Sequence, residues 1–461
     1  MKGFSHMHVK SAVRNHLKDT FRCSHLTTMQ IGQIVPLFAE EMINGGTFNI
    51  KGRYFSRLAP LVKPTYGDFF FKTVDVFVPY HQLAFDFTAW QEGKTTYEGI
   101  TPSSRYLNYT DILVFFGTYG TTNGSSTNYD YSYIDSGGST AYRKFTDVGR
   151  YYFKILCSLG YNIPQNVDLQ SNSNFMTQVN SQPLSAMPLL AFAKGYNDYM
   201  SQSQRFNTSS LTNFLRCVKY NISTTGYYPA SHNISSDGIN VIFSNIKLCY
   251  ENDYFTSAWQ NPNSALYGNQ SLVTIGSTPG TSGTDQLLNG NAGVSENIPV
   301  SQITASDHRV TIYQRMLDFL ESYDKWVRRN VYSGSRDVQQ IYSRFGIKPE
   351  DYRSHYADVI HTDSMQIQVG DVTSMAETTY QPLGYYAGKG ILSGQNSSKY
   401  RCSDYGLRMI LGYITVRPFY PYGSFRQVLR NQPLDYYTPE FDGLGAKYSY
   451  QRYFPFYGSR Q

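Results

Sequence analysis

The stretch "YGDFFFKTVDVFV", Tyr66 to Val78, decides the fold class of this chain. At a period of two residues its apolar side chains form two faces, Phe70, Val74, Val76 and Val78 on one and Phe69, Phe71 and Phe77 on the other. A strand that is apolar on both faces is covered on both sides. The stretch therefore predicts a buried β-strand that Pro79 ends.

A second strand of this character lies near the other end of the sequence, in "LRMILGYITVRP", Leu407 to Pro418. Its two apolar faces are Ile410, Ile414 and Val416 against Leu407, Met409, Leu411 and Tyr413. Pairing between the two ends of the chain would produce a non-local antiparallel sandwich. We therefore expect a mainly β protein of the Greek-key or jelly-roll type, with the intervening segments inserted as loops and a few helices.

Helical and polar segments lie between these strands. Apolar residues recur at three and four from Ser306 to Asn330, which predicts a helix, and a shorter helical pattern in "GSRDVQQIYSRFG" stops at Gly346. We expect these helices to decorate the sandwich. Residues 117–140 and 261–297 are rich in Gly, Ser, Thr and Asn and predict surface loops.

The composition favours a protein that is covered by other subunits. Charged residues are 16% of the 461, against about 25% in typical domains, while 42 Tyr and 28 Phe bring aromatics to 16%. Five cysteines without a C-x-x-C pair favour thiols in a reducing compartment. The sequence has no apolar run typical of a signal peptide or a membrane span, so we expect a protein that is used without membrane insertion.

The positive charge is concentrated at the N-terminus, although the net charge is only +6. We divide the chain into a basic arm, residues 1–23, and a single body, residues 24–461. Two interpretations of the arm stay open, a solvated terminus and a segment that contacts nucleic-acid phosphates. In the second interpretation the contacting residues are Lys2, Lys10, Arg14, Lys18 and Arg22, to which we add Arg328 and Arg329.

Enzyme signals are weak. Asp135-Ser136-Gly137-Gly138 matches the nucleophile string of trypsin-like proteases, but none of the nine histidines has the sequence context of the catalytic base. His355, Asp358, His361 and Asp363 could supply metal ligands, yet their spacing fits no known metal signature and favours a polar interface loop. The sequence also lacks a nucleotide-binding glycine motif, so we predict no enzymatic activity, no cofactor and no metal.

Six segments together resemble the major capsid proteins of the Microviridae, and look most similar to those of gokushovirus-like phages. They are "SHLTTMQIGQIVPLFAEEMINGGTFNI" from Ser24, "FFFKTVDVFVPYHQLAFDFTAW" from Phe69, "MPLLAFAKGYNDYM" from Met187, "YENDYFTSAWQNP" from Tyr250, "SRFGIKPEDYR" from Ser343 and "YGLRMILGYITVRPFYPYGSFRQVLRNQPLDYYTPEFDGLG" from Tyr405. The segments follow the family's order and span nearly the whole chain, and departures fall mainly in the polar loops.

This resemblance implies an eight-stranded antiparallel jelly roll with polar surface insertions around residues 117–140 and 261–297. It further implies sixty copies in a T=1 icosahedral shell, built through pentamers, that encloses a circular single-stranded DNA genome. The implied partners are a minor pilot protein, a small basic DNA-binding protein and a host-cell receptor. The implied location is the virion, assembled in the bacterial cytoplasm.

Candidate subunit-interface residues are aromatic or apolar, and lie in the fourth and last of these segments: Tyr254, Phe255, Trp259, Tyr436, Tyr437, Pro439, Phe441 and Leu444. For the last five, an intrachain strap that closes the core is an equally good interpretation. Two other functions stay open, a secreted carbohydrate-binding β-sandwich and a polysaccharide hydrolase with paired carboxylates.

Overall fold

The structure is a computed structural model of the chain. It describes residues 20–42, 44–59, 68–122, 131–134, 140–161, 183–201, 209–224, 226, 228, 232–248, 251, 286–288, 295–297, 318, 322, 325–326, 329, 337–347, 356–370, 388–417, 426–430, 436 and 439.

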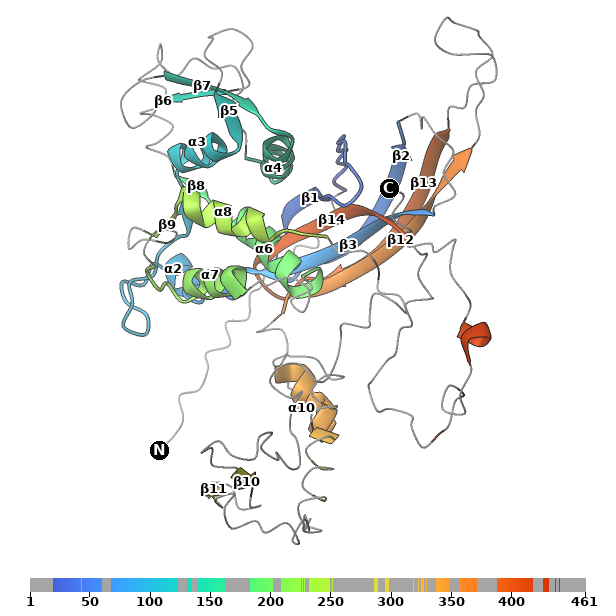
Figure 1. Ribbon diagram of the computed structural model, residues 1–461. Helices are drawn as coiled ribbons and strands as arrows, with labels where there is room; N and C mark the ends of the chain where they lie inside the picture. Colours follow the sequence, from blue (N-terminus) through green and yellow to red (C-terminus); the bar gives the residue numbers. More distant parts are fainter. Residues whose placement is uncertain are drawn as a thin grey trace, which may run out of the picture.

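A curled antiparallel sheet of six strands forms the centre of the described residues (Figure 1), in the order β1-β14-β3-β12-β13-β2. The strands are β1 (Ile34–Met42), β2 (Thr47–Arg57), β3 (Phe69–Pro79), β12 (Asp358–Gly370), β13 (Lys389–Arg401) and β14 (Gly406–Val416). Strand β14 lies between β1 and β3, with Gly406 opposite Pro79 and Val416 opposite Phe69. This register confirms that strands from opposite ends of the chain pair.

The sheet divides at β12 into two layers. Strand β12 pairs with β3 from Asp358 to Ile367, but with β13 only from Gln368 to Gly370. Strand β13 then pairs with β2 along the whole length of β2. We call β1, β14, β3 and β12 the four-stranded layer, and β13 with β2 the ribbon.

The ribbon packs on one face of the four-stranded layer, which we call its ribbon side. Phe71, Ile367 and Ile414 of the layer form one apolar cluster with Leu392 and Tyr54 of the ribbon. The other face of β3 and β14 contributes Val76, Val78, Leu407, Met409 and Leu411 to a separate core. Both strands are thus apolar on two faces, as the alternation of their residues predicts. The architecture is mainly antiparallel and fits a jelly roll; the count of eight strands stays a prediction.

Glycines allow close contacts at the ribbon. A Cβ atom on Gly394 would lie 2.1 Å from Sδ of Met365 in β12, so a side chain at this position would push the ribbon away from the layer. A Cβ atom on Gly52 would lie 2.4 Å from Oδ1 of Asn396 on the neighbouring strand, so a side chain there would displace Asn396 within the ribbon.

Helices cover the other face of the four-stranded layer, which we call its helix side (Figure 1). The described helices of residues 80–245 are α1 (Tyr80–Leu83), α2 (Phe87–Gln91), α3 (Tyr109–Thr118), α4 (Asp147–Ser158), α6 (Met187–Tyr199), α7 (Ser209–Lys219) and α8 (Ser236–Asn245). Aromatic side chains join them: Phe243 lies 5.3 Å from Phe115 and 4.7 Å from Tyr152, measured between ring centroids.

The sequence did not predict this helical layer of residues 80–245. Helix α6 buries Phe192 and Tyr196 completely, and it packs on the strands, where Gly195 comes close to Val76. Nine of its thirteen residues are buried, so the helix has no broad polar face and its sequence carries little helical periodicity. The apolar valines of β3 need this cover, which is the physical reason for a helical layer.

Three small sheets complete the described strands. They are β4 (Tyr106–Leu107) with β8 (Leu184–Ser185) and β9 (Asn233–Ile234); β5 (Gly120–Thr122) with β6 (Tyr131–Ile134) and β7 (Thr140–Phe145); and β10 (Gln286–Leu288) with β11 (Ser295–Asn297). The polar stretch 117–140 is thus not simply a loop, since it contains β5 and β6. "YSYI" in β6 is rich in residues that favour strands. In residues 261–297 the described part is the β10–β11 hairpin.

Of the two helices expected from the sequence, the shorter is confirmed as α10 (Asp337–Phe345). Gly346 ends it at φ +69°, and its N–H donates to the carbonyl oxygen of Tyr342 at 2.9 Å. Most of residues 306–330 lies outside the described residues, and the described ones, 318, 322, 325–326 and 329, are helical. A 3-10 helix, η3 (Arg426–Leu429), follows the sheet.

No described helix is both long enough and apolar enough to cross a membrane. Among the described cysteines, Cys23, Cys157, Cys217 and Cys402, none forms a disulfide bond.

Candidate assembly and nucleic-acid surfaces

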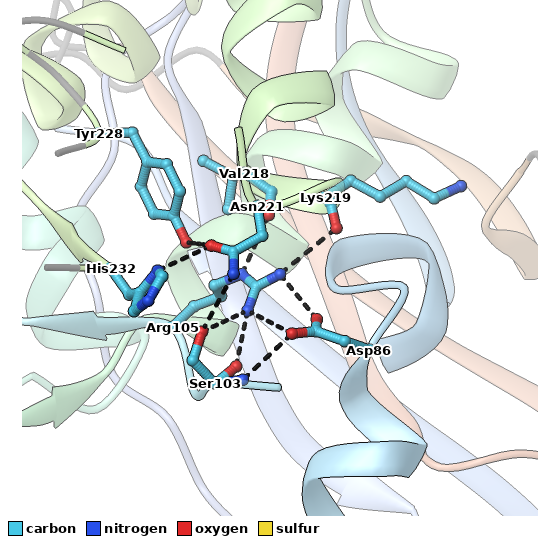
Figure 2. A network of polar contacts seen from close by, with 8 residues as sticks. All are labelled: Asp86, Ser103, Arg105, Val218, Lys219, Asn221, Tyr228 and His232. Carbon is cyan, nitrogen blue, oxygen red and sulfur yellow. Dashed lines mark hydrogen bonds and ion pairs between the residues drawn. The ribbon is translucent and has the colours of Figure 1, made fainter. Parts of the chain in front are cut away.

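A buried ion pair ties together the helix side of the molecule (Figure 2). Arg105 Nη2 donates to Asp86 Oδ1 at 2.7 Å, and neither side chain is exposed. Arg105 Nε also donates to the carbonyl oxygen of Val218 at 3.0 Å, and Nη2 to that of Lys219 at 3.4 Å. These carbonyl groups belong to the last turn of α7, whose partial negative charge a guanidinium neutralises. The pair therefore joins the start of α2 to the end of α7.

The ion pair continues into a hydrogen-bonded network (Figure 2). Ser103 donates its N–H to Asp86 Oδ2 at 3.1 Å and accepts from Arg105 Nη1 through its own carbonyl oxygen at 2.6 Å. Asn221 Oδ1 accepts from the hydroxyl of Tyr228 at 3.0 Å and lies 2.7 Å from Nδ1 of His232. Burial raises the pKa of Tyr228 to about 12, so its hydroxyl stays protonated and donates. The network fixes the loop that follows α7.

This network is structural rather than catalytic. A serine nucleophile needs a histidine base within hydrogen-bond reach. Here Nδ1 of His232 faces Asn221, while Ser103 Oγ lies 3.1 Å from Arg105 Nη1. The guanidinium and the carboxylate use their hydrogen-bonding capacity on each other and on nearby protein groups, as buried charges must.

A second ion pair lies inside the sandwich, between the layer and the ribbon. Arg408 of β14 donates from Nε to Asp75 Oδ1 at 3.0 Å and from Nη2 to Oδ2 at 2.7 Å. The Arg408 guanidinium carbon also lies 5.1 Å from the ring centroid of Phe38. Burial raises the pKa of Asp75, an effect that the hydrogen bonds from Arg408 and the charge of His361 oppose. The pair aligns β3 with β14.

Residues 20–33 run towards β1 and are held by α4. The hydroxyl of Tyr151 accepts from the N–H of Ile34 at 3.0 Å, and Lys154 Nζ donates to Thr28 Oγ1 at 2.9 Å. Two apolar side chains of this segment nevertheless face solvent, since Leu26 is 99% exposed and Phe21 is 71% exposed. The anchoring contacts begin at Thr28, so Phe21 and Leu26 lie in the exposed stretch before them, and contact with another molecule would cover these side chains.

The outward face of the ribbon is basic. On β2 and β13 every second residue points away from the sandwich and is exposed. The cations among these outward residues are Lys51, Arg53, Arg57, Lys389, Lys399 and Arg401. Neither strand contains Asp or Glu. We call these six residues the basic ribbon face.

Comparison with known proteins identifies the kind of protein that carries this fold and these surfaces. Residues 7–105, which include β1, β2 and β3, match the capsid protein (F protein) family of phages. The chain is 22% identical to capsid protein VP1 of Chlamydia phage 1 over 487 aligned residues, which cover 94% of this chain and 77% of VP1. These two matches support a Microviridae-like major capsid protein. The resemblance described from six sequence segments is thereby confirmed.

The structure describes only part of the predicted DNA-contact set. Arg22 is exposed in residues 20–33, and Arg329 is exposed within the helical residues near α10. The others, Lys2, Lys10, Arg14, Lys18 and Arg328, lie outside the described residues.

The predicted interface residues of the capsid chain are also described in part. Tyr436 is 56% exposed, and the Arg430 guanidinium carbon lies 5.3 Å from its ring centroid. Pro439 is exposed as well. The remaining candidates, Tyr254, Phe255, Trp259, Tyr437, Phe441 and Leu444, lie outside the described residues.

Of the residues in the two weak enzyme signals, some are not described, while Asp358, His361 and Asp363 follow one another along β12, so this stretch is a strand rather than the expected loop. Ser136 and His355 lie outside the described residues. Asp358 and His361 both belong to β12, where Asp358 Oδ2 accepts from the hydroxyl of Tyr400 at 2.8 Å and His361 sits opposite Asp75. Across the described residues, no group of three His, Cys, Asp or Glu side chains could hold a metal ion.

The sequence interpretation missed the basic ribbon face of the capsid chain. The signal was present in "KGRYFSR" and "SSKYR", where cations fall on alternate positions and acids are absent. Periodicity of charge, rather than of apolar residues, would have found it.

Proposed function

We propose that this capsid protein self-assembles into a T=1 shell of sixty copies, built through pentamers, that encloses a circular single-stranded DNA genome. In this proposal the chain works in the virion, is assembled in the bacterial cytoplasm and has no catalytic role. Residues 24–461 form one shell-building body, and residues 1–23 form a basic arm.

One observation carries the proposal beyond the family: the exposed apolar side chains of residues 20–33. Leu26 and Phe21 are exposed, and both precede Thr28, where the contacts of the segment with α4 begin. A surface of this kind gains free energy when another subunit covers it. Symmetry then repeats the contact around a closed shell, so that individually weak interfaces hold together. The exposed Tyr436 supports a similar contact for the C-terminal segment, in preference to an intrachain strap.

Charge supports the predicted nucleic-acid partners. At +6 per chain, sixty copies carry a formal charge of +360. A genome of kilobase length carries on the order of thousands of phosphates, so cations or basic proteins must neutralise the remainder. A small basic DNA-binding protein would meet this need, and a minor pilot protein and a host-cell receptor complete the proposed partners.

Electron microscopy and sedimentation velocity of the purified chain test the assembly, at low and high salt and with and without single-stranded DNA. We expect closed isometric particles or pentamers. A chain that stays monomeric in every condition, including after addition of DNA and a basic partner, would contradict the proposal.

Substitution of Leu26 tests the contact itself. Because Leu26 is 99% exposed, Leu26→Ser cannot disturb the core, and we expect at least a tenfold loss of shell yield with an unchanged thermal midpoint of the dissociated chain. Leu26→Met, which keeps the apolar area, is the matched control and should assemble. Equal yields for Leu26→Ser and the wild type would show that the segment is not an interface. Phe441→Ala tests the C-terminal segment in the same way. If the segment is an interface, shell yield should fall while the chain folds normally. If it is an intrachain strap, shell yield and folding should both decline.

A further inference from the structure

We propose that the basic ribbon face binds the backbone of a single-stranded nucleic acid. The inference rests on the proposed function for the presence of a genome, and it assigns that genome a surface separate from the N-terminal arm.

The first argument is the one-sided charge of the ribbon. Three cations of β2 and three of β13 share the outward face, and neither strand carries an acid. Among the described residues, none of the six forms an ion pair with the rest of the chain. By contrast, the cations Arg105 and Arg408 elsewhere in the fold are paired with carboxylates. A cluster of unneutralised cations creates a field that attracts polyanions.

The second argument is the spacing of the cations. Residues on one face of a strand recur at about 7 Å, and neighbouring strands lie about 4.8 Å apart, so the six side chains form a band rather than a point. The register places each described cation opposite an uncharged residue: Arg53 opposite Gln395, Lys51 opposite Ser397 and Lys399 opposite Asn49. Direct repulsion across the strands is thereby avoided while the band stays continuous. Such a band can follow a sugar–phosphate chain over several phosphates.

The third argument is an aromatic ring within the band. Phe55 points outward between Arg53 and Arg57 and is 64% exposed. The Arg57 guanidinium carbon lies 5.1 Å from the Phe55 ring centroid, which adds a planar cation to the ring. An exposed sheet surface with aromatic rings and cations binds unpaired bases by stacking and their backbone by charge. A duplex hides its bases from such a surface, and this favours a single strand as the ligand.

Fluorescence anisotropy with the full-length chain and a labelled oligothymidylate, at several salt concentrations, tests the proposal. We compare the wild type with the triple variant Lys51→Gln, Arg53→Gln and Lys399→Gln. Loss of three phosphate contacts should weaken binding at least about tenfold at low salt and reduce the slope of log K against log salt by about 2. The matched control removes three exposed cations elsewhere, through Lys144→Gln, Arg150→Gln and Arg216→Gln, and should keep the wild-type slope.

A neutral substitution separates stacking from charge. Phe55→Ala should weaken binding of the oligothymidylate about fivefold or more and leave the salt slope unchanged. The same variant should bind a duplex of equal length as the wild type does.

Shell formation, followed by electron microscopy in the same preparations, separates this inference from the proposed function. If the wild type binds the oligonucleotide, the triple variant binds it more weakly than the control variant, and the wild type forms no shells even with DNA and a basic partner, the proposed function fails and this inference stands. If the wild type forms shells and the triple variant forms shells with less DNA, both stand. Three results would overturn the inference: no binding by the wild type, equal losses in the triple variant and its control, or a triple variant that binds DNA normally but no longer forms shells. The last result would make the ribbon face a subunit contact.

Discussion

The two sides of the four-stranded layer are built differently. On the helix side, aromatic residues from α3, α4 and α8 and the buried residues of α6 form the largest core of the described residues. On the ribbon side, a thin core with a few buried residues such as Phe71, Ile367 and Leu392 separates the layer from the ribbon, and the two come close at Gly394. The helix side is therefore expected to determine most of the folding free energy. The ribbon side leaves β2 and β13 half exposed, with an outer face that is available for contacts.

The largest losses of stability should come from the same substitution in the two buried ion pairs. Asp86→Asn leaves Arg105 charged, fully buried and unpaired, which should cost about 3–5 kcal/mol of unfolding free energy. Asp75→Asn should cost less, about 2–3 kcal/mol, because the Arg408 side chain is 11% exposed rather than fully buried and lies against the ring of Phe38. The raised pKa of Asp75 also makes the cost of Asp75→Asn smaller, because burial at this site already disfavours the charged carboxylate. Urea unfolding of the dissociated chain measures both.

Equal losses of unfolding free energy at the two positions would contradict the comparison, because they would show that the ribbon side shields its ion pair from water as well as the helix side does. The double variants Asp86→Asn with Arg105→Met and Asp75→Asn with Arg408→Met serve as controls. Each should recover part of the loss by removing the unpaired charge.

Glycine substitutions should give the next largest effect. A Cβ atom on Gly406 would lie 2.5 Å from the carbonyl oxygen of Val78 and 2.6 Å from the ring of Phe77, and rotation of a side chain cannot relieve a backbone contact. We expect Gly406→Ala to cost about 2–3 kcal/mol. On the helix side, a Cβ atom on Gly195 would lie 3.3 Å from Cγ2 of Val76. The better helix propensity of alanine should offset that tight contact, so Gly195→Ala should be nearly neutral. Thermal unfolding of both variants measures this difference. A larger loss of stability for Gly195→Ala would show that the contact between α6 and β3 leaves no room for a methyl group.

The smallest expected effect concerns pH. Burial and the charge of Arg105 lower the pKa of His232. The unfolded chain then binds more protons than the folded chain just below the ordinary histidine pKa of about 6.5, so stability should fall as the pH drops through that range. His232→Asn, which tolerates the backbone φ of +63° at this position, should remove this component. Its thermal midpoint should fall by about 1–2 °C less than that of the wild type between pH 7 and pH 5. Parallel pH profiles would show that His232 does not contribute.

The sequence predicted the parts of the fold that depend on local alternation. Phe71 and Val76 lie on opposite faces of β3 because of their positions alone, so the alternation predicts two buried faces. Strand β14 has the same pattern. Strands β12 and β13 were not predicted, because polar residues such as Gln366 and Ser397 occupy their outward positions. Helix α6 was missed for the opposite reason, since its apolar residues surround the axis.

The polar network could not have been predicted from the sequence. Asp86, Arg105, Asn221 and His232 come from separate segments, and nothing near any one of them in the chain identifies its partners. Their contacts exist only after α2, β4 and α7 have packed together. The basic ribbon face differs, because its alternating cations can be recognised in the sequence once the strands are known.

The position of β14 between β1 and β3 has a consequence for biosynthesis. When β3 leaves the ribosome, residues 80–405 must still be made before its neighbour β14 begins to appear. At about 5–20 residues per second this takes roughly 15–65 s, during which β3 has no strand to pair with on its β14 side. The nascent chain therefore needs protection from aggregation by chaperones. The same delay postpones assembly, because β1, which follows the exposed segment 20–33, gains its neighbour β14 only after residue 416 has been added.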